Sequence, residues 1–566
     1  MLICQFTQAI LPLFTLYLTK LLIDSIALSK NNIEFKEVLV YVLLIGFIQF
    51  VQAMVGNYQM MISETQKQLV SDHMSSIIID KALSLDLSYY ENPEFHNTFH
   101  QAQRQALYRP TLILTKLTEF LKSSFLLVSI AGLLLFMHWS IAIILITFAL
   151  PIAFVKWHYS KKLYSWEKKR TSLEREASYI NKVLTADTYV KEVRIFNIGE
   201  SLKERFIKIR KQLFTEKFKI FNARARSSIY AKSVEIIASV LTYSFIVFNA
   251  VDGSITVGDL VMYFQAFQKG QVAIQSSLNS LVGINDNRLF LNYIFNFLAL
   301  EPKIKAPEIP INLTLPIESV EFDNISFKYP DNKSDTISDL SLKFNKGQVI
   351  AIVGENGSGK TTLIKLLSRL YDPYSGTIKY NGIDIKNIDP IQVRKSISVI
   401  YQDFAKYQLT TKENIEIADI KNKGSEDKLI TSAKKSTALE FINSLEHKFE
   451  QQLGKRFTNG HELSTGQWQK IALTRAFYKD AEIIILDEPS SSIDPLSEAK
   501  IFEELKSIAK NKILILISHR IYNLSLADQI IVLDKGIVKE KGSHEELLSK
   551  GGIYKEMFSK QSINNI

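Results

Sequence analysis

Apolar positions follow different patterns in the two parts of the chain. Before Pro302, long apolar runs alternate with basic stretches, whereas the chain after Ser319 has the pattern of a soluble α/β domain. Some of the long runs fall short of the roughly 18 residues of an unambiguous membrane span, but each reaches spanning length through polar flanks that are compatible with a helix. The pattern therefore predicts six transmembrane helices, built around residues 11–26, 38–55, 125–137, 141–155, 236–251 and 260–274.

Basic residues gather in one stretch of the first part. Between Trp157 and Lys232 the chain is rich in Lys and Arg, whereas only His138, Trp139 and Ser140 connect the third apolar run to the fourth. The positive-inside rule places the basic stretch in the cytoplasm and the short connection outside. Cytoplasmic loops that face an anionic leaflet also account for the net charge of +10. We therefore expect a multi-pass protein of the lipid bilayer, and no basic motif interleaved with aromatic residues favours a nucleic-acid partner.

Prolines mark the boundary between the two parts. Residues 300–316 contain four prolines, which exclude a continuous helix there. The single cysteine, Cys4, excludes a disulfide framework and a cysteine-based zinc site. The sequence thus predicts a membrane domain with cytoplasmic helix extensions at residues 1–300, a linker at 301–318 and a soluble domain at 319–566.

A glycine-rich segment carries the first chemical signal of the soluble part. Residues 354–362 read GENGSGKTT, and they lie between an apolar strand-like run at 349–353 and a helix-like run at 361–370. The N–H groups of such a loop point at nucleotide phosphates, while its Lys reaches the β and γ oxygens and its Thr holds Mg²⁺. A glycine turn before a buried helix would not require the Lys-Thr pair. We expect this P-loop to bind ATP for hydrolysis through Gly354, Asn356, Gly357, Gly359, Lys360, Thr361 and Thr362, with Thr361 also on Mg²⁺.

Later segments narrow the class of ATPase, since the loop alone fits kinases, GTPases, motors and transporters. Residues 463–467, LSTGQ, lead into a predicted helix at 468–478, and an apolar strand at 483–486 ends in Asp487 and Glu488. In this order the segments resemble the nucleotide-binding domain of ABC transporters, with its Walker A loop, signature motif and Walker B strand. Further matches in the expected order are Tyr329 (A-loop), Gln402 (Q-loop), Asp494 (D-loop) and His519 (switch histidine).

The resemblance implies a role for each residue of the catalytic centre. Asp487 is expected to hold Mg²⁺, because hard cations take oxygen ligands. Glu488 would accept the proton of the attacking water, and His519 would contact the γ-phosphate and orient that water. Gln402 is expected to belong both to the catalytic residues and to the Mg²⁺ ligands. Tyr329 is expected to stack on adenine. The alternative interpretations are a strand-end cap for Asp487, a surface acid for Glu488, a structural histidine for His519 and a cross-strand aromatic for Tyr329.

The signature motif predicts a partner. Ser464 precedes a helix, so that its hydroxyl and the N–H groups that follow it form a second anion site, and we expect Ser464, Gly466 and Gln467 to contact a nucleotide. In ABC transporters two nucleotide domains pack head to tail and each closes the ATP site of the other, with the D-loop, here Asp494, at the same interface. We therefore expect a homodimer with ATP between the two copies. Thr465 stands where the family usually has glycine.

Parts of the membrane domain show the same likeness. Residues 83–102 and 190–206 resemble the intracellular loops whose short coupling helices dock on the nucleotide domains, and the alternative is an ordinary amphipathic helix surface. Six spans before one nucleotide domain are the layout of exporter-type half-transporters. The last span carries a polar stripe, which fits the wall of a translocation path or hydrogen bonds between helices. Its members are Gln265, Gln268, Gln275 and Asn279.

Two short stretches point to the kind of cargo. Residues 467–469 (QWQ) and 91–93 (ENP) look most like bacterial exporters of lantibiotics and other peptides. We expect ATP-driven export of an amphipathic peptide across the bacterial cytoplasmic membrane by alternating access. A lipid or drug flippase would share every motif, and a non-transporting membrane ATPase regulator would share the soluble half. Both stay as alternatives.

Overall fold

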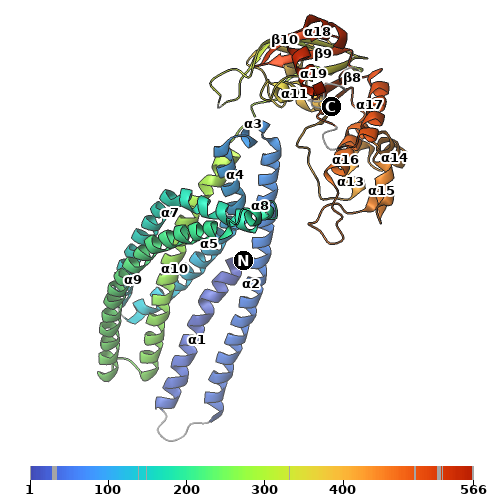
Figure 1. The fold of residues 1–566 in the computed structure, drawn as a ribbon. Coiled ribbons are helices and arrows are strands. Elements are labelled where there is room, and N and C mark those ends of the chain that lie inside the picture. Colours follow the sequence, from blue (N-terminus) through green and yellow to red (C-terminus); the bar gives the residue numbers. More distant parts are fainter. Residues whose placement is uncertain are drawn as a thin grey trace. The chain divides into compact units, whose positions relative to one another are not determined.

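The chain folds into two compact units. In the computed structural model, the first unit comprises Met1–Ser84 and Glu94–Leu300, and the second comprises Leu85–Pro93 and Glu301–Ile566. The first unit is helical and the second is an α/β domain (Figure 1). The structure describes residues 2–28, 35–137, 139–147, 149–330, 332–489, 493–518, 524 and 527–563.

Long helices build the first unit, because its apolar runs continue into helix-compatible polar flanks. Leu16, Ile130, Ile141 and Phe267, from four different helices, meet in its buried core. The helices are α1 (Leu2–Leu28), α2 (Phe35–Ser84), α4 (Pro93–Ala106), α5 (Arg109–Met137), α6 (Trp139–Thr147), α7 (Leu150–Thr185), α8 (Val190–Ile195), α9 (Gly199–Val251) and α10 (Val257–Leu298).

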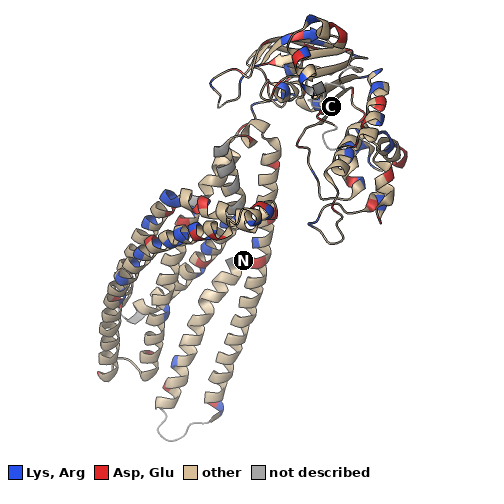
Figure 2. Ribbon diagram, viewed as in Figure 1, with Lys and Arg blue, Asp and Glu red and all other residues tan. Residues whose placement is uncertain are grey.

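Within the described ranges, five helices are long and apolar enough to cross a membrane. They are α1, α2, α5, α9 and the stretch from Trp139 to Thr185. Figure 2 shows the long uncharged part of α2, which holds no Lys, Arg, Asp or Glu between residues 38 and 63. The sixth predicted span lies in α10, which has 42 residues but carries the polar stripe along an otherwise apolar helix.

The predicted fourth span falls on α6, which ends at Thr147, and on the first turns of α7, which begins at Leu150 with Pro151 in its first turn. Proline has no backbone N–H and fits the first turn of a helix.

The basic stretch forms paired helical extensions. Helices α7 and α9 run side by side and are joined by the short helix α8 (Figure 1). Ala177 and Ile180 of α7 pack against Ile209 and Leu213 of α9. On the same pair, the Arg170 guanidinium donates two hydrogen bonds to the Glu216 carboxylate, at 2.7 and 2.8 Å.

Two sheets form the frame of the second unit. One is antiparallel, with strand order β2-β1-β4-β5, and the other has the order β10-β9-β3-β8-β7-β6 and is parallel from β9 to β6. The strands are β1 (Ser319–Phe327), β2 (Ile337–Asn345), β3 (Val349–Val353), β4 (Ser375–Tyr380), β5 (Ile383–Asp384), β6 (Ile397–Ile400), β7 (Ile483–Asp487), β8 (Ile513–Ile517), β9 (Gln529–Asp534) and β10 (Ile537–Gly542).

Helices cover the parallel sheet. Every residue of β3, β7 and β8 is buried, as expected for parallel strands covered on both faces. The helices of this unit are α3 (Leu87–Tyr90), α11 (Lys360–Leu367), α12 (Pro390–Lys395), α13 (Thr411–Glu416), α14 (Glu426–Lys435), α15 (Leu439–Ser444), α16 (Thr465–Tyr478), α17 (Pro495–Ala509), α18 (His544–Lys550) and α19 (Ile553–Ile563), with single 3₁₀ turns at Ile385–Asn387, Ile420–Asn422 and Lys448–Glu450.

Helix α16 connects two hydrophobic cores. Its Leu473 and Phe477 pack with one face of the parallel sheet. Its Trp468 and Tyr478 belong to a separate core that α13, α14 and α15 share. The helix that follows the signature motif is therefore held by the sheet and by the small helical layer together.

Candidate ATP-binding site

The P-loop lies where β3 leads into α11, and its glycines occupy positions that other residues would not tolerate. A Cβ at Gly354 would lie 2.2 Å from the carbonyl oxygen of Leu533. Gly359 has φ of +106° at the start of α11, in the left-handed region that favours glycine. The sequence-predicted Asn356 and Gly357 lie between them, in the turn itself.

Lys360 is held across the loop. Its Nζ donates hydrogen bonds of 2.8 Å to the carbonyl oxygens of Gly354 and Glu355. Burial lowers the pKa of the Lys360 ammonium, against the attraction of Asp487 and Glu488. The Ser358 hydroxyl is buried and has no hydrogen-bond partner among the described residues. A phosphate in the loop would supply an acceptor for both side chains.

The carboxyl end of β7 brings the predicted Mg²⁺ ligands together. The parallel strands β3, β8 and β7 are neighbours, so that their carboxyl ends lie at one edge of the sheet. Asp487 is 6% exposed there and accepts a hydrogen bond from the Thr361 hydroxyl. Burial raises the pKa of Asp487 to about 6, and the Glu488 carboxylate adds to the rise. A hard divalent cation fits this oxygen-rich, negatively charged position.

Glu488 and Gln402 meet at the same edge. The Gln402 amide donates a 3.0 Å hydrogen bond to the Glu488 carboxylate. Glu488 has φ of +53°, a strained conformation for a residue with a side chain, and such strain is concentrated at functional sites. Its backbone N–H donates to the carbonyl oxygen of Ile517, the last residue of β8, at 2.9 Å.

Sequence reasoning missed one residue that supports Glu488. Gln469 of α16 is 3% exposed, and its amide donates a 2.9 Å hydrogen bond to the Glu488 carbonyl oxygen. The signal was a polar residue inside the apolar face of the predicted helix 468–478. Which group it would bond could not be read from the sequence.

Tyr329 lies beside the P-loop helix. It follows β1, which ends at Phe327, and so does not pair across the sheet. The Tyr329 hydroxyl is 3.0 Å from the Thr362 hydroxyl, and its ring packs edge-to-face against Phe327 and Tyr371. The ring is partly buried, which leaves part of its surface accessible.

The signature residues form a capped helix start. The Gln467 N–H donates to the Ser464 hydroxyl at 3.3 Å, and the Ser464 N–H donates to the Gln467 side chain at 2.9 Å. Ser464 and Thr465 are exposed, and Gly466 is half-buried. In the described part of the chain, no hydrogen bond joins Ser464, Gly466 or Gln467 to the P-loop of the same chain.

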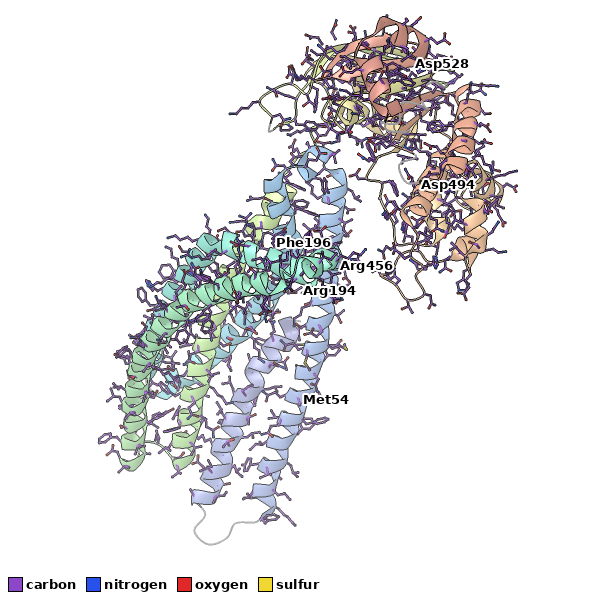
Figure 3. The ribbon with its side chains drawn as sticks, in the orientation of Figure 1. Met54, Arg194, Phe196, Arg456, Asp494 and Asp528 are labelled. Atoms are coloured by element: carbon purple, nitrogen blue, oxygen red, sulfur yellow. The ribbon has the colours of Figure 1, made fainter. Side chains whose placement is uncertain are left out.

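Asp494 caps the next helix. Its carboxylate accepts the Ser497 N–H at 2.9 Å and lies 3.5 Å from the Lys470 ammonium. These contacts, the Ser497 hydrogen bonds foremost, lower the pKa of Asp494 to about 2. Figure 3 labels Asp494 beside the helices of this region. Sequence-predicted His519 lies outside the described residues, as do Ser490 to Ser492 next to Asp494.

The polar stripe of α10 is engaged with neighbouring helices. The Gln275 amide donates a 2.6 Å hydrogen bond to the Glu235 carboxylate of α9. Asn279 accepts a hydrogen bond from Lys156 of α7. Gln268 is exposed, and Gln265 is half-buried. Gln275 and Asn279 thus support hydrogen bonds between helices, and Gln268, although exposed, also contacts the Tyr243 hydroxyl of α9.

Comparison with protein families gives matches to both units. The model described as "ABC transporter transmembrane region" matches residues 1–269, and the model described as "ABC transporter" matches residues 337–491. Among solved structures, a bacterial Atm1-family ABC exporter with ATP bound has a TM-score of 0.88 and 21% identity, covering 99% of this chain and 98% of that one.

Curated relatives match the chain over nearly its full length. The subtilin transport ATP-binding protein SpaT of Bacillus subtilis is 33% identical, over 98% of this chain and 90% of that protein. The nisin transport ATP-binding protein NisT of Lactococcus lactis is 31% identical, over 97% and 91%. An ATP-dependent lipid A-core flippase of Haemophilus ducreyi is 27% identical, over 96% and 92%.

Proposed function

We propose that this chain, which belongs to the ABC transporter family, exports an amphipathic peptide by alternating access. As a member of this family it is a multi-pass protein of the cytoplasmic membrane, and its ATPase domain binds ATP and couples hydrolysis to transport. The observation that supports a peptide cargo is the full-length similarity to subtilin and nisin transport proteins. The lipid A flippase relative supports a lipid cargo as the second candidate.

The proposed ATP hydrolysis uses side chains at the carboxyl ends of the parallel strands, beside the P-loop. Lys360 binds the β- and γ-phosphates in place of its two carbonyl partners. Glu488 accepts the proton of the attacking water, and Gln402 orients its carboxylate. Thr361, Asp487 and Gln402 supply oxygen atoms that suit Mg²⁺, which would neutralise charge on the phosphates. His519 keeps its proposed role at the γ-phosphate.

A second copy of the chain would complete the site. The capping box occupies the N–H groups of Ser464 and Gln467. It leaves the N–H groups of Thr465 and Gly466, the first two of α16, for an anion. That helix start is exposed and is not bonded to the P-loop of its own chain. We therefore propose that Ser464, Gly466 and Gln467 of one copy close the ATP bound by the other, with Asp494 at the same interface.

Helix α8 is proposed to carry the conformational change. Its end exposes two large apolar side chains, Ile195 at 79% and Phe196 at 67%. Figure 3 labels Arg194 and Phe196 at this turn. The exposed apolar end of α8 supports the proposed role of this segment as a coupling helix.

Flux into inverted membrane vesicles tests this function. A fluorescent nisin-like precursor peptide and a fluorescent phospholipid are offered separately, with ATP or ADP, to vesicles that hold the wild type or Glu488→Gln. Export of a peptide predicts ATP-dependent uptake of the peptide by the wild type alone. Movement of only the phospholipid would favour the flippase, and ATP hydrolysis without flux of either would favour the regulator.

A further inference from the structure

One short segment of the chain belongs to the ATPase unit although both of its neighbours belong to the membrane unit. Leu85–Pro93, which contains α3, groups with the second unit, between α2 and α4 of the first. Leu87 packs against the core of the antiparallel sheet and α11. The Asp86 carboxylate accepts the N–H groups of Lys303 and Ile304. The segment is therefore fixed to the ATPase unit by apolar packing and by hydrogen bonds.

Glu91, at the end of this segment, makes two strong contacts. Its carboxylate accepts a 2.6 Å hydrogen bond from the Lys365 ammonium and a 2.5 Å hydrogen bond from the Tyr371 hydroxyl. The Lys365 side chain is 17% exposed and that of Glu91 is 37% exposed. Lys365 lies on α11, one turn after Thr361, and thus on the helix that begins at the P-loop.

The same two partners of Glu91 surround Tyr329. The Lys365 ammonium lies 5.1 Å from the centre of the Tyr329 ring, in a cation–π contact. The Tyr371 ring lies 5.3 Å from the Tyr329 ring, edge-to-face. A cavity of about 320 Å³ opens beside them, lined by Ser88, Glu91, Asn92, Tyr329 and Lys365 among others.

The pKa shifts of Lys365 and Tyr371 favour their hydrogen bonds to Glu91. Burial lowers the pKa of the Lys365 ammonium, but its hydrogen bond to Glu91 and its attraction to Tyr329 and Glu91 together outweigh this effect, and the net pKa is raised. Burial and the Glu91 carboxylate both raise the pKa of the Tyr371 phenol. At neutral pH, Lys365 is therefore charged and Tyr371 carries its proton, so that both can donate to Glu91.

We propose that Glu91 is a positioning residue for ATP binding. Through Lys365 and Tyr371, Glu91 fixes the Tyr329 ring where it would receive the adenine base of ATP. The inference rests on the proposed role of Tyr329 as the adenine platform. It adds that a residue from the chain between two membrane-domain helices sets the affinity for the nucleotide. Because the partners of Glu91 are Lys365 and Tyr371, which surround Tyr329, Glu91 acts on binding of ATP and not on its hydrolysis.

The test measures ATP hydrolysis by the full-length protein in nanodiscs without cargo. Glu91→Gln removes the carboxylate charge at nearly constant size and is expected to raise the KM for ATP about fivefold, with kcat within about twofold. Charge-assisted hydrogen bonds are strong, but partial exposure of Glu91 reduces their effect. Inhibition by tripolyphosphate, which has no base, should not change. Glu318→Gln removes another ion pair of the same unit, to Lys346 at 2.9 Å, and serves as the matched control with unchanged KM.

A double-mutant cycle with Tyr329→Ala separates positioning from general support. If Glu91 acts through Tyr329, Glu91→Gln should raise the KM in the wild type and have no further effect in Tyr329→Ala. Tyr371→Phe, which keeps the ring, is the second variant if Glu91→Gln folds poorly, and it should raise the KM as well. An equal rise of KM in both backgrounds, or a fall in kcat at constant KM, would overturn the proposal.

The role of Tyr329 as the adenine platform and the role of Glu91 as its positioning residue can be tested separately. If Tyr329→Ala leaves the KM for ATP unchanged, the adenine platform is wrong, and the role of Glu91 falls with it. If Tyr329→Ala raises the KM and neither Glu91→Gln nor Tyr371→Phe does, only the role of Glu91 is wrong. Since the assay contains no cargo, a failure to transport peptide does not affect either result.

Discussion

Replacing Gln469 by leucine tests whether the carbonyl of Glu488 must be held for catalysis. Gln469 is 3% exposed on α16 and donates a 2.9 Å hydrogen bond to that carbonyl. Leucine is similar in size and cannot donate. The substitution therefore removes the hydrogen bond without opening a large cavity.

The expected effects follow from the geometry of Glu488. Loss of one buried hydrogen bond costs roughly 0.5–1.5 kcal/mol of stability. Glu488 has φ of +53°, and such a conformation persists only where the surroundings hold it. If relaxation of this residue raises the activation barrier by about 1.4 kcal/mol, hydrolysis slows about tenfold. The KM for ATP should stay near the wild-type value, because the P-loop is not altered.

Single-turnover ATP hydrolysis and thermal unfolding are measured on the same preparation. Gln451→Leu is the matched control, since Gln451 is also buried and donates to backbone carbonyl oxygens, those of Gln452 and Asn459, at 3.2 and 3.0 Å. Both variants should lose stability, but only Gln469→Leu should lose rate. Equal rates per folded molecule in Gln469→Leu and the control would show that the bond from Gln469 to the Glu488 carbonyl is not needed for catalysis.

Five further substitutions test the ATP site and the polar stripe of α10. Glu488→Gln should retain ATP while single-turnover hydrolysis nearly stops, because the base is lost and the phosphate loop is intact; turnover near wild type would remove Glu488 from the mechanism. Thr465→Gly should raise the steady-state ATPase rate if the threonine side chain crowds the γ-phosphate of the ATP bound by the partner copy. Ser464→Arg should abolish ATPase activity. Equal rates for wild type and Thr465→Gly would mean that the threonine is neutral. Gln275→Leu should lower the unfolding temperature, since the buried Glu235 carboxylate loses its 2.6 Å donor and such a loss costs about 1–3 kcal/mol. Replacing the exposed Gln268 by leucine should leave the unfolding temperature unchanged and reduce stimulation of the ATPase by peptide.

Much of the ATPase unit could be predicted because its signals are local. The strand predicted at 349–353 has the same bounds in β3, since a fully apolar run between a turn and a glycine-rich loop leaves few alternatives. The signature helix was predicted at 468–478 and begins three residues earlier, at Thr465, with Ser464 as its N-cap. The predicted helix after the P-loop ends earlier than expected, at Leu367.

The remaining features depend on contacts between distant parts of the chain. The bond from Gln469 to Glu488 and the bond from Gln275 to Glu235 each join separate elements, and hydropathy or spacing does not specify such partners. The contact of Glu91 with Lys365 joins residues 274 positions apart, beyond any local pattern.

The grouping of Leu85–Pro93 with the ATPase unit makes that unit discontinuous in the sequence. The chain therefore passes from one unit to the other at three junctions, after Ser84, after Pro93 and after Leu300. A single protease cut in the proline-rich linker would divide the ATPase unit itself, because residues 85–93 would stay covalently attached to the membrane unit and residues 319–566 would not. A soluble fragment that starts at Glu301 would also lack Leu87, and the apolar surface that Leu87 covers would face water. Recombinant ATPase fragments of this chain should therefore aggregate more readily than a fragment in which residues 85–93 are supplied as a fused segment.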